Sequence, residues 1–141
     1  MSIEKNIEIV KRFTEEVVNN QKFELVDDLW TVDMQWHGGF MGEISGIENY
    51  KKFLTSAVDG SFVNMHLQIK DIIAQEDKVL LYFSNSGKNV KDFLGYKATG
   101  REAIWNGMSI YRIENGKIAE AWYSEDLLMM FVQLNFIKFN Q

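Results

Sequence analysis

The sequence predicts an α+β domain in which a curved antiparallel sheet wraps around three N-terminal helices and a short C-terminal helix closes the chain. Apolar residues recur every three or four positions before residue 60, and at every second position after it. The pair Asn115-Gly116 is a strong signal for a two-residue hairpin between two of the strands. Because helices come first and strands follow, the sheet must bury one face against the helices, which leaves a cone.

Three helices are expected in the first part of the chain. The first has an apolar stripe that includes Ile3, Ile7, Val10 and Val17. It is expected to end at residues 19–21, where two asparagines and a glutamine follow one another. A short second helix is expected over residues 22–30 and a third over residues 46–58, each with its apolar residues on one face. Between them, residues 34–39 are expected to form one short strand.

Four strands and a helix are expected in the second part. Residues 63–73 alternate between apolar and polar side chains, as a half-buried strand does. Residues 79–87 begin with five apolar residues, which suggests a central strand. Residues 101–114 and 117–125 flank the hairpin pair, and residues 127–134 have the apolar spacing of a short closing helix.

Length and composition predict one globular domain over residues 1–141 and exclude several partners. Apolar residues make up 46% of the chain and aromatic residues 13%, enough for a core and an apolar cavity. The net charge of −5 argues against nucleic acid or an anionic membrane as a partner. Without cysteine, the chain has no disulfide framework and no thiolate metal site. No apolar run has the length of a signal peptide or membrane span, so a cytoplasmic location is the default expectation.

Several motifs resemble the SnoaL-like polyketide cyclases and occur in the order of that family. They are residues 71–87, Thr99-Gly100-Arg101, Ile110-Tyr111-Arg112-Ile113, Gly116-Lys117-Ile118, Glu120-x-Trp122-x-x-x-Asp126 and Gln133-Leu134. The resemblance covers about residues 5–135. It implies the cone-shaped fold of nuclear transport factor 2, which the periodicity also indicates, and a homodimer formed through the sheet.

The resemblance implies an intramolecular aldol condensation of a polyketide ester, with an aspartate as acid and base and without metal or cofactor. Asp126 matches that aspartate. A carboxylate in an apolar pocket has a raised pKa and is a stronger base than a solvated one. We therefore predict a cofactor-independent aldol cyclase that acts on a hydrophobic carbonyl or ester compound. Asp126 could also cap the closing helix, and Glu125, with the opposite strand parity, is expected to face solvent.

Further candidates are polar or aromatic residues near the expected cavity. His37 is the candidate donor to the enolate, although a histidine beside two glycines can equally mark an exposed strand end. Asn106 could bind a substrate carbonyl, or form a bulge with Gly107. The aromatic residues that could either contact a flat ligand or belong to the core are Trp36, Trp105, Trp122 and Tyr111. His66 is expected at the surface, and two separated histidines without an acidic ligand pattern predict no metal site.

Departures from the family pattern leave other functions open. Gly87-Lys88-Asn89 stands where many members have a Gly-Thr-His segment, so that histidine is absent. The alternatives are a non-catalytic domain that binds a hydrophobic ligand, an isomerase like ketosteroid isomerase, and a structural interaction module. Whether the chain is an enzyme is therefore left open by the sequence.

Overall fold

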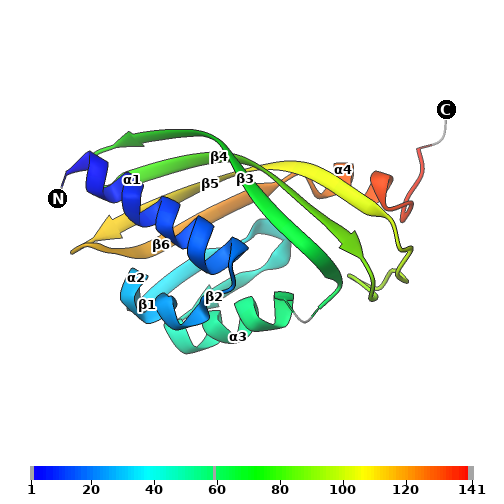
Figure 1. Ribbon diagram of the computed structural model, residues 1–141, viewed down its shortest axis with the longest axis horizontal. Helices are drawn as coiled ribbons and strands as arrows, with labels where there is room; N and C mark the ends of the chain where they lie inside the picture. The colour runs from blue at the N-terminus through cyan, green and yellow to red at the C-terminus, as the bar shows by residue number, and fades with distance from the viewer. Residues whose placement is uncertain (1, 59, 140–141) are drawn as a thin grey trace.

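The computed structural model describes residues 2–58 and 60–139 and has one six-stranded sheet that curves around the helices (Figure 1). The strands are β1 Trp30–His37, β2 Glu43–Ser45, β3 Phe62–Gln75, β4 Lys78–Asn89, β5 Glu102–Glu114 and β6 Lys117–Glu125. Their order across the sheet is β2-β1-β6-β5-β4-β3. The predicted α+β class, with helices first and a meander of strands after them, is confirmed.

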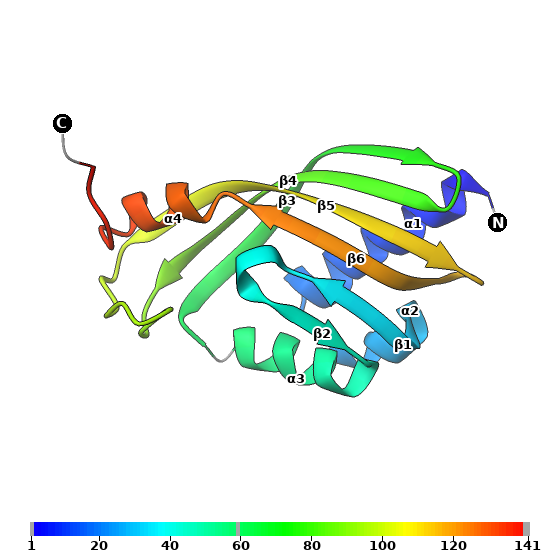
Figure 2. The same ribbon diagram turned by 180° about the vertical axis from the view of Figure 1, so that it is seen from behind.

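One strand pair differs from the antiparallel sheet that the sequence predicts. β1 runs parallel to β6, as the view from behind shows, while every other neighbouring pair is antiparallel (Figure 2). The sequence signal for antiparallel pairing is a tight turn, such as the one at Asn115 and Gly116, whose φ angles of 51° and 79° suit a two-residue hairpin. No such turn joins β1 to β6, because most of the chain lies between them.

The N-terminal helix lies against the concave face of the sheet (Figure 1). α1, Ile3–Arg12, continues without a break into the wider turns of η1, Phe13–Asn19. Ser2 begins the helix, because its hydroxyl accepts a hydrogen bond from the backbone N–H of Lys5 at 3.1 Å. The predicted stripe is confirmed where it meets the sheet, since Val10 and Val17 are fully buried.

The remaining helices are η2 Phe23–Leu25, α2 Val26–Leu29, η3 Gly39–Met41, α3 Ile47–Val58 and α4 Leu127–Gln133. Among them, α3 is the longest and packs against β1, β2 and β3, while the others are short. The second and third helices that the sequence predicts correspond to η2 with α2, and to α3. No helix in residues 2–58 and 60–139 is both long enough and apolar enough to span a membrane.

Aromatic side chains from helices and strands fill the core between the two layers. Trp30 packs edge-on against Phe13, with ring centroids 5.1 Å apart, and lies 4.6 Å from the ring of Tyr50. Tyr111 approaches both Phe13 and Trp30 from β5. These rings bury large apolar areas, so this cluster stabilises the contact between helices and sheet.

Candidate functional site

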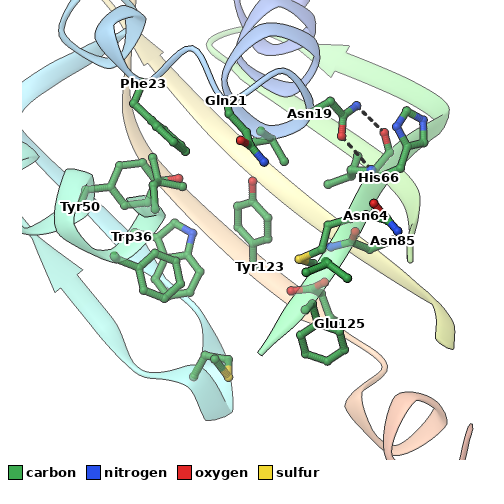
Figure 3. A pocket seen from close by; sticks show the side chains of 18 residues that line it. Asn19, Gln21, Phe23, Trp36, Tyr50, Asn64, His66, Asn85, Tyr123 and Glu125 are labelled. Atoms are coloured by element: carbon green, nitrogen blue, oxygen red, sulfur yellow. Dashed lines mark hydrogen bonds between the residues drawn. The ribbon is translucent and has the colours of Figure 1, made fainter. Parts of the chain in front are cut away.

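The space between the helices and the concave face of the sheet contains a pocket of about 390 Å³ (Figure 3). Its body is apolar, with Trp36, Phe53 and Phe62 among the residues that line it. The polar residues that line it are Asn19, Gln21, Tyr50, Asn64, His66, Asn85, Tyr123 and Glu125. A mostly apolar cavity of this size with a few polar groups is the usual form of a small-molecule site.

Glu125, the last residue of β6, places its carboxyl group in this pocket. The indole N–H of Trp105 donates a hydrogen bond to Glu125 Oε1 at 3.0 Å. Burial raises the pKa of the Glu125 carboxyl above its ordinary value, while hydrogen bonds from Trp105 and Asn85 lower it. The prediction that Glu125 faces solvent is wrong, because alternation along β6 directs Tyr123 and Glu125 to the concave face.

Gly107 provides the room for this carboxylate. It is paired with Glu125 across the β5–β6 ladder and with Phe83 across the β4–β5 ladder. A Cβ atom at position 107 would lie 2.5 Å from the Phe83 ring and 2.8 Å from Glu125 Cγ. The ladder runs through Asn106 and Gly107 without a register shift, so the bulge considered from the sequence is not formed.

Two tyrosines lie beside Glu125, of which Tyr111 is fully buried and Tyr123 is half-buried. The hydroxyl groups of Tyr111 and Tyr123 are hydrogen-bonded to each other. Burial raises the pKa of Tyr111 to about 12 and raises the pKa of Tyr123 well above its ordinary value. Both hydroxyls therefore keep their protons near neutral pH and can act as hydrogen-bond donors. Tyr123 itself lines the pocket, two residues before Glu125 on the same face of β6.

Asp126 is exposed and lies one residue beyond the end of β6. Its Oδ1 accepts a hydrogen bond from the backbone N–H of Met129 at 3.0 Å, which is the helix-capping role considered from the sequence. Asp126 lines a second recess, of about 440 Å³, between the Gly38–Met41 turn and the start of α4. Glu125 and Tyr123 also border that recess, so the two hollows meet at these residues.

His37 lies away from the pocket, which corrects the position expected from the sequence. Alternation along β1 turns Trp36 into the pocket and His37 to the other face of the sheet. Its Nδ1 lies 2.6 Å from Glu43 Oε1, and its Nε2 lies 2.7 Å from Glu120 Oε2. Hydrogen bonds to Glu43 and Glu120 raise the pKa of His37. With both ring nitrogens engaged, His37 is not available to an enolate in the pocket.

The predicted substrate-binding residues fall into separate places. Asn106 is outside the pocket, because it shares the convex face of β5 with Met108, and its Oδ1 accepts a hydrogen bond from Lys70 Nζ at 3.3 Å. Trp122 is on the same convex face, where its ring stacks on His37 with centroids 5.5 Å apart. Asn106 has the parity of Ile104 and Met108, and these apolar residues are exposed on the convex face and do not line the cavity.

Three aromatic predictions concern the concave side. Trp36 lines the pocket, whereas Trp105 and Tyr111 are buried behind the groups that line it. Trp105 contacts the carboxyl of Glu125, which lines the pocket, and Tyr111 contacts the hydroxyl of Tyr123. These two residues therefore position pocket groups and do not themselves form its wall.

His66 is exposed at the surface, as expected from the sequence, and it also lines the mouth of the pocket. β3 shifts register between Val63 and His66, where Asn64 has a φ of 57°. This irregularity brings five consecutive residues of β3, 63–67, to the rim. Asn19 holds the strand there, since its side-chain amide bonds the backbone N–H and C=O of Leu67 at 2.8 and 2.9 Å. Within residues 2–58 and 60–139, no group of three or more His, Asp or Glu side chains could hold a metal ion.

Comparison with known proteins places this geometry among related folds. The model of a family described as SnoaL-like polyketide cyclase matches residues 8–134. A structure from Jannaschia sp. CCS1, described as a SnoaL-like polyketide cyclase, is 18% identical over 98% of this chain and 97% of that one, with a TM-score of 0.86. No curated protein matches the chain.

Two further structures have the same fold under different descriptions. TsrD from Streptomyces laurentii is 22% identical over 97% of this chain and 99% of its own, with a TM-score of 0.82. An LEH-like epoxide hydrolase from M. tuberculosis is 17% identical over 95% of this chain and 92% of its own, with a TM-score of 0.76. At these identities the likeness establishes the fold, and the chemistry must be argued from the pocket.

Proposed function

The chain belongs to the SnoaL-like polyketide cyclase family, and from this premise we propose that it is a cofactor-independent aldol cyclase with Glu125 as its acid and base. The observation that carries the proposal is the position of Glu125 and Tyr123, two residues apart on one face of β6 in an apolar pocket. A desolvated carboxylate next to a neutral hydroxyl donor is the arrangement needed to form an enolate from a carbonyl compound.

The proposed reaction has three steps within one substrate molecule. The Glu125 carboxylate removes a proton from the carbon next to a carbonyl, and the electron pair of that C–H bond moves into an enolate whose oxygen accepts a hydrogen bond from Tyr123. The enolate carbon then attacks a second carbonyl carbon and forms the new C–C bond. The resulting alkoxide takes the proton back from Glu125, which restores the carboxylate.

Tyr111 supports the role of Tyr123 as donor. In the proposed state the Tyr111 hydroxyl donates to the oxygen of Tyr123, which leaves the Tyr123 proton free for the enolate oxygen. A chain of two hydroxyls polarises the terminal O–H and strengthens its hydrogen bond to a negative oxygen. Because burial keeps both phenols protonated, this donor remains available throughout the neutral pH range.

Asp126 is the base that the family resemblance predicts, and it is the direct competitor of Glu125. Its exposure and its hydrogen bond to the Met129 N–H favour a capping role. The recess beside Asp126 meets the pocket at Glu125, so the experiment must test both carboxylates.

The test is deuterium exchange at the α-carbon of a panel of β-keto esters and enones, followed by NMR. Glu125→Gln is expected to reduce exchange by about 100-fold or more, and Asp126→Asn to leave it near the wild-type rate. Tyr123→Phe is expected to lower exchange without abolishing ligand binding. The reverse result for the two carboxylates would transfer the role of base to Asp126. No exchange by the wild-type protein would remove the cyclase proposal.

A non-catalytic ligand-binding domain is the second candidate, because the same pocket would serve it. Ligand binding without α-proton exchange would favour that function. An isomerase would share the first step with the cyclase, so exchange alone does not separate them. Product analysis does, because the cyclase forms a C–C bond and the isomerase only moves a double bond.

The convex face of the sheet supports a further part of the proposal, that two copies of the chain pair through it. Apolar side chains are exposed on this face, with Ile73 of β3 60% accessible and Ile104 and Met108 of β5 54% and 52% accessible. Isolated exposed apolar residues are ordinary, but a group of them across a sheet favours an interface between symmetric copies. The family resemblance favours the same homodimer.

A further inference from the structure

The described residues that line the pocket include one negatively charged residue, Glu125, but no lysine or arginine to balance it. A ligand carboxylate placed there would lose its hydration without gaining a cation partner, and it would meet the negative charge of Glu125. The pocket therefore disfavours anionic ligands and suits uncharged ones.

Two side-chain amides at the mouth are free to bind a ligand. Gln21 and Asn64 line the pocket, and within the described residues their amide groups make no hydrogen bond. Both residues have left-handed backbones, with φ angles of 61° and 57°. At Gln21 this conformation ends the N-terminal helix, where the Lys22 N–H bonds the Glu16 carbonyl, and at Asn64 it accompanies the register shift of β3.

The other two amides of the pocket are already occupied. Asn19 bonds the backbone of Leu67, as the dashed lines in Figure 3 show, and Asn85 Oδ1 accepts a hydrogen bond from the Ser86 N–H at 3.0 Å. Gln21 instead extends from the end of the N-terminal helix into the pocket, toward the hydroxyl of Tyr123 (Figure 3). It is therefore the amide best placed to contact a ligand that also reaches Tyr123.

We propose, on the basis of the cyclase function above, that the substrate is an uncharged compound with two separate oxygen functions and that Gln21 selects for the second one. The reacting carbonyl lies at Tyr123 and Glu125. A second ketone, ester or hydroxyl oxygen of the same molecule accepts a hydrogen bond from the Gln21 amide. Its apolar skeleton contacts Trp36 and Phe53, which line the same pocket. Gln21 is thus a specificity-determining residue.

Three matched probes test the charge selection by calorimetry, without any turnover. Methyl 4-acetylbenzoate has a ketone and an ester, 4-acetylbenzoate has a carboxylate in place of the ester, and 4-propylacetophenone has a hydrocarbon chain there. At pH 8 the wild-type protein is expected to bind the ester about tenfold or more tightly than the carboxylate. In Glu125→Gln, which removes the opposing charge, this preference is expected to fall to about threefold or less.

The role of Gln21 is tested by Gln21→Met, which keeps the side-chain length and removes the amide. The preference for the ester over 4-propylacetophenone, about threefold or more in the wild type, is expected to disappear, while binding of the propyl ketone stays unchanged. Gln68→Met is the matched control, because Gln68 is exposed on β3 and does not line the pocket. That variant is expected to keep the wild-type ratio.

Three results would overturn the inference. Equal affinity of wild-type protein for the ester and the carboxylate would exclude selection against charge. An unchanged ratio of ester to propyl ketone in Gln21→Met would exclude the role of that amide. No measurable binding of the ester up to its solubility limit would exclude the substrate class. The cyclase can fail separately, since these affinities could hold in a protein that exchanges no α-protons.

Discussion

Gly107 lies directly opposite Glu125 in the β5–β6 ladder, and the absence of a side chain at position 107 admits the carboxyl group to the pocket. The same gap accommodates the ring of Phe83 from β4. Residues of three neighbouring strands are thus packed together here, and a single methyl group added at position 107 would contact both Phe83 and Glu125. The register of β5 and β6 therefore determines where the Glu125 side chain lies.

Gly107→Ala is expected to destabilise the fold by about 1–3 kcal/mol, because the new Cβ must displace the Phe83 ring or Glu125. It should also lower α-proton exchange, since either displacement moves the proposed base. Urea unfolding monitored by tryptophan fluorescence measures the first effect. Asn106→Ala, one residue away on the convex face, is the control and should change stability by less than about 0.5 kcal/mol. If Gly107→Ala proved as stable as the wild type, the strand would be able to relax and admit the methyl group.

Trp105 is expected to set the working pH of Glu125. Its indole N–H stabilises the charged carboxylate and so lowers the pKa of Glu125. Trp105→Phe removes the donor, so the pKa of Glu125 should rise and the basic form should appear at higher pH. The measurement is the pH profile of α-deuterium exchange, whose rising limb is expected to move to higher pH.

Trp30→Phe is the matched control for that profile. The indole Nε1 of Trp30 is buried without a hydrogen-bond partner in the described structure, so its loss removes an aromatic N–H without touching Glu125. The rising limb should then stay at its wild-type position. If the rising limb moved equally in Trp105→Phe and Trp30→Phe, the cause would be a general loosening of the core and not the lost hydrogen bond to Glu125.

The sequence predicted the elements well because their signals are local. The period of the apolar residues and the Asn115-Gly116 turn depend only on neighbouring positions, and the helices and strands follow them. The parallel pairing of β1 with β6 depends on contacts across most of the chain, which no local pattern encodes.

The candidate site was harder to predict, because a shift of one residue along a strand moves a side chain to the opposite face of the sheet. β6 ends at Glu125 and the helix begins after Asp126, so one position separates the buried carboxylate from the exposed cap. The family resemblance implies Asp126 as the base, whereas Glu125 shares its strand parity with Tyr123 and so faces the pocket. The register shift in β3, which brings His66 to the mouth, likewise has no clear local signal except Asn64, a residue type that tolerates a left-handed backbone.

The buried charge of Glu125 should also make stability depend on pH. Burial raises its folded-state pKa above the unfolded value of 4.5, so the folded state favours the protonated carboxyl. This contribution to stability is complete below pH 4.5 and is lost as the pH rises through the folded-state pKa. The glutamine of the Glu125→Gln variant cannot ionise. The unfolding free energy of this variant minus that of the wild type should therefore increase from pH 4 to pH 8.

Urea unfolding of both proteins at the two pH values provides the measurement for Glu125→Gln. Glu8→Gln, at an exposed position of α1, controls for the removal of one negative charge. Its difference from wild type should change less between the two pH values. A difference for Glu125→Gln that does not depend on pH would mean that this carboxyl is solvated in the folded protein.

Met108→Lys is expected to separate the proposed dimer into monomers. Met108 lies on the convex face of β5 between Tyr82 of β4 and Ser124 of β6, so a lysine there would place a charge within the shared apolar surface. In a symmetric dimer each copy would bury one unpaired lysine charge, so the free-energy cost of burial would arise twice. Sedimentation velocity should show a dimer for the wild type and a monomer for the variant. Phe40→Lys, at a 76% exposed residue outside the sheet, is the control and should remain dimeric. A monomeric wild-type protein, or a dimer that Met108→Lys leaves intact, would exclude this face as the interface.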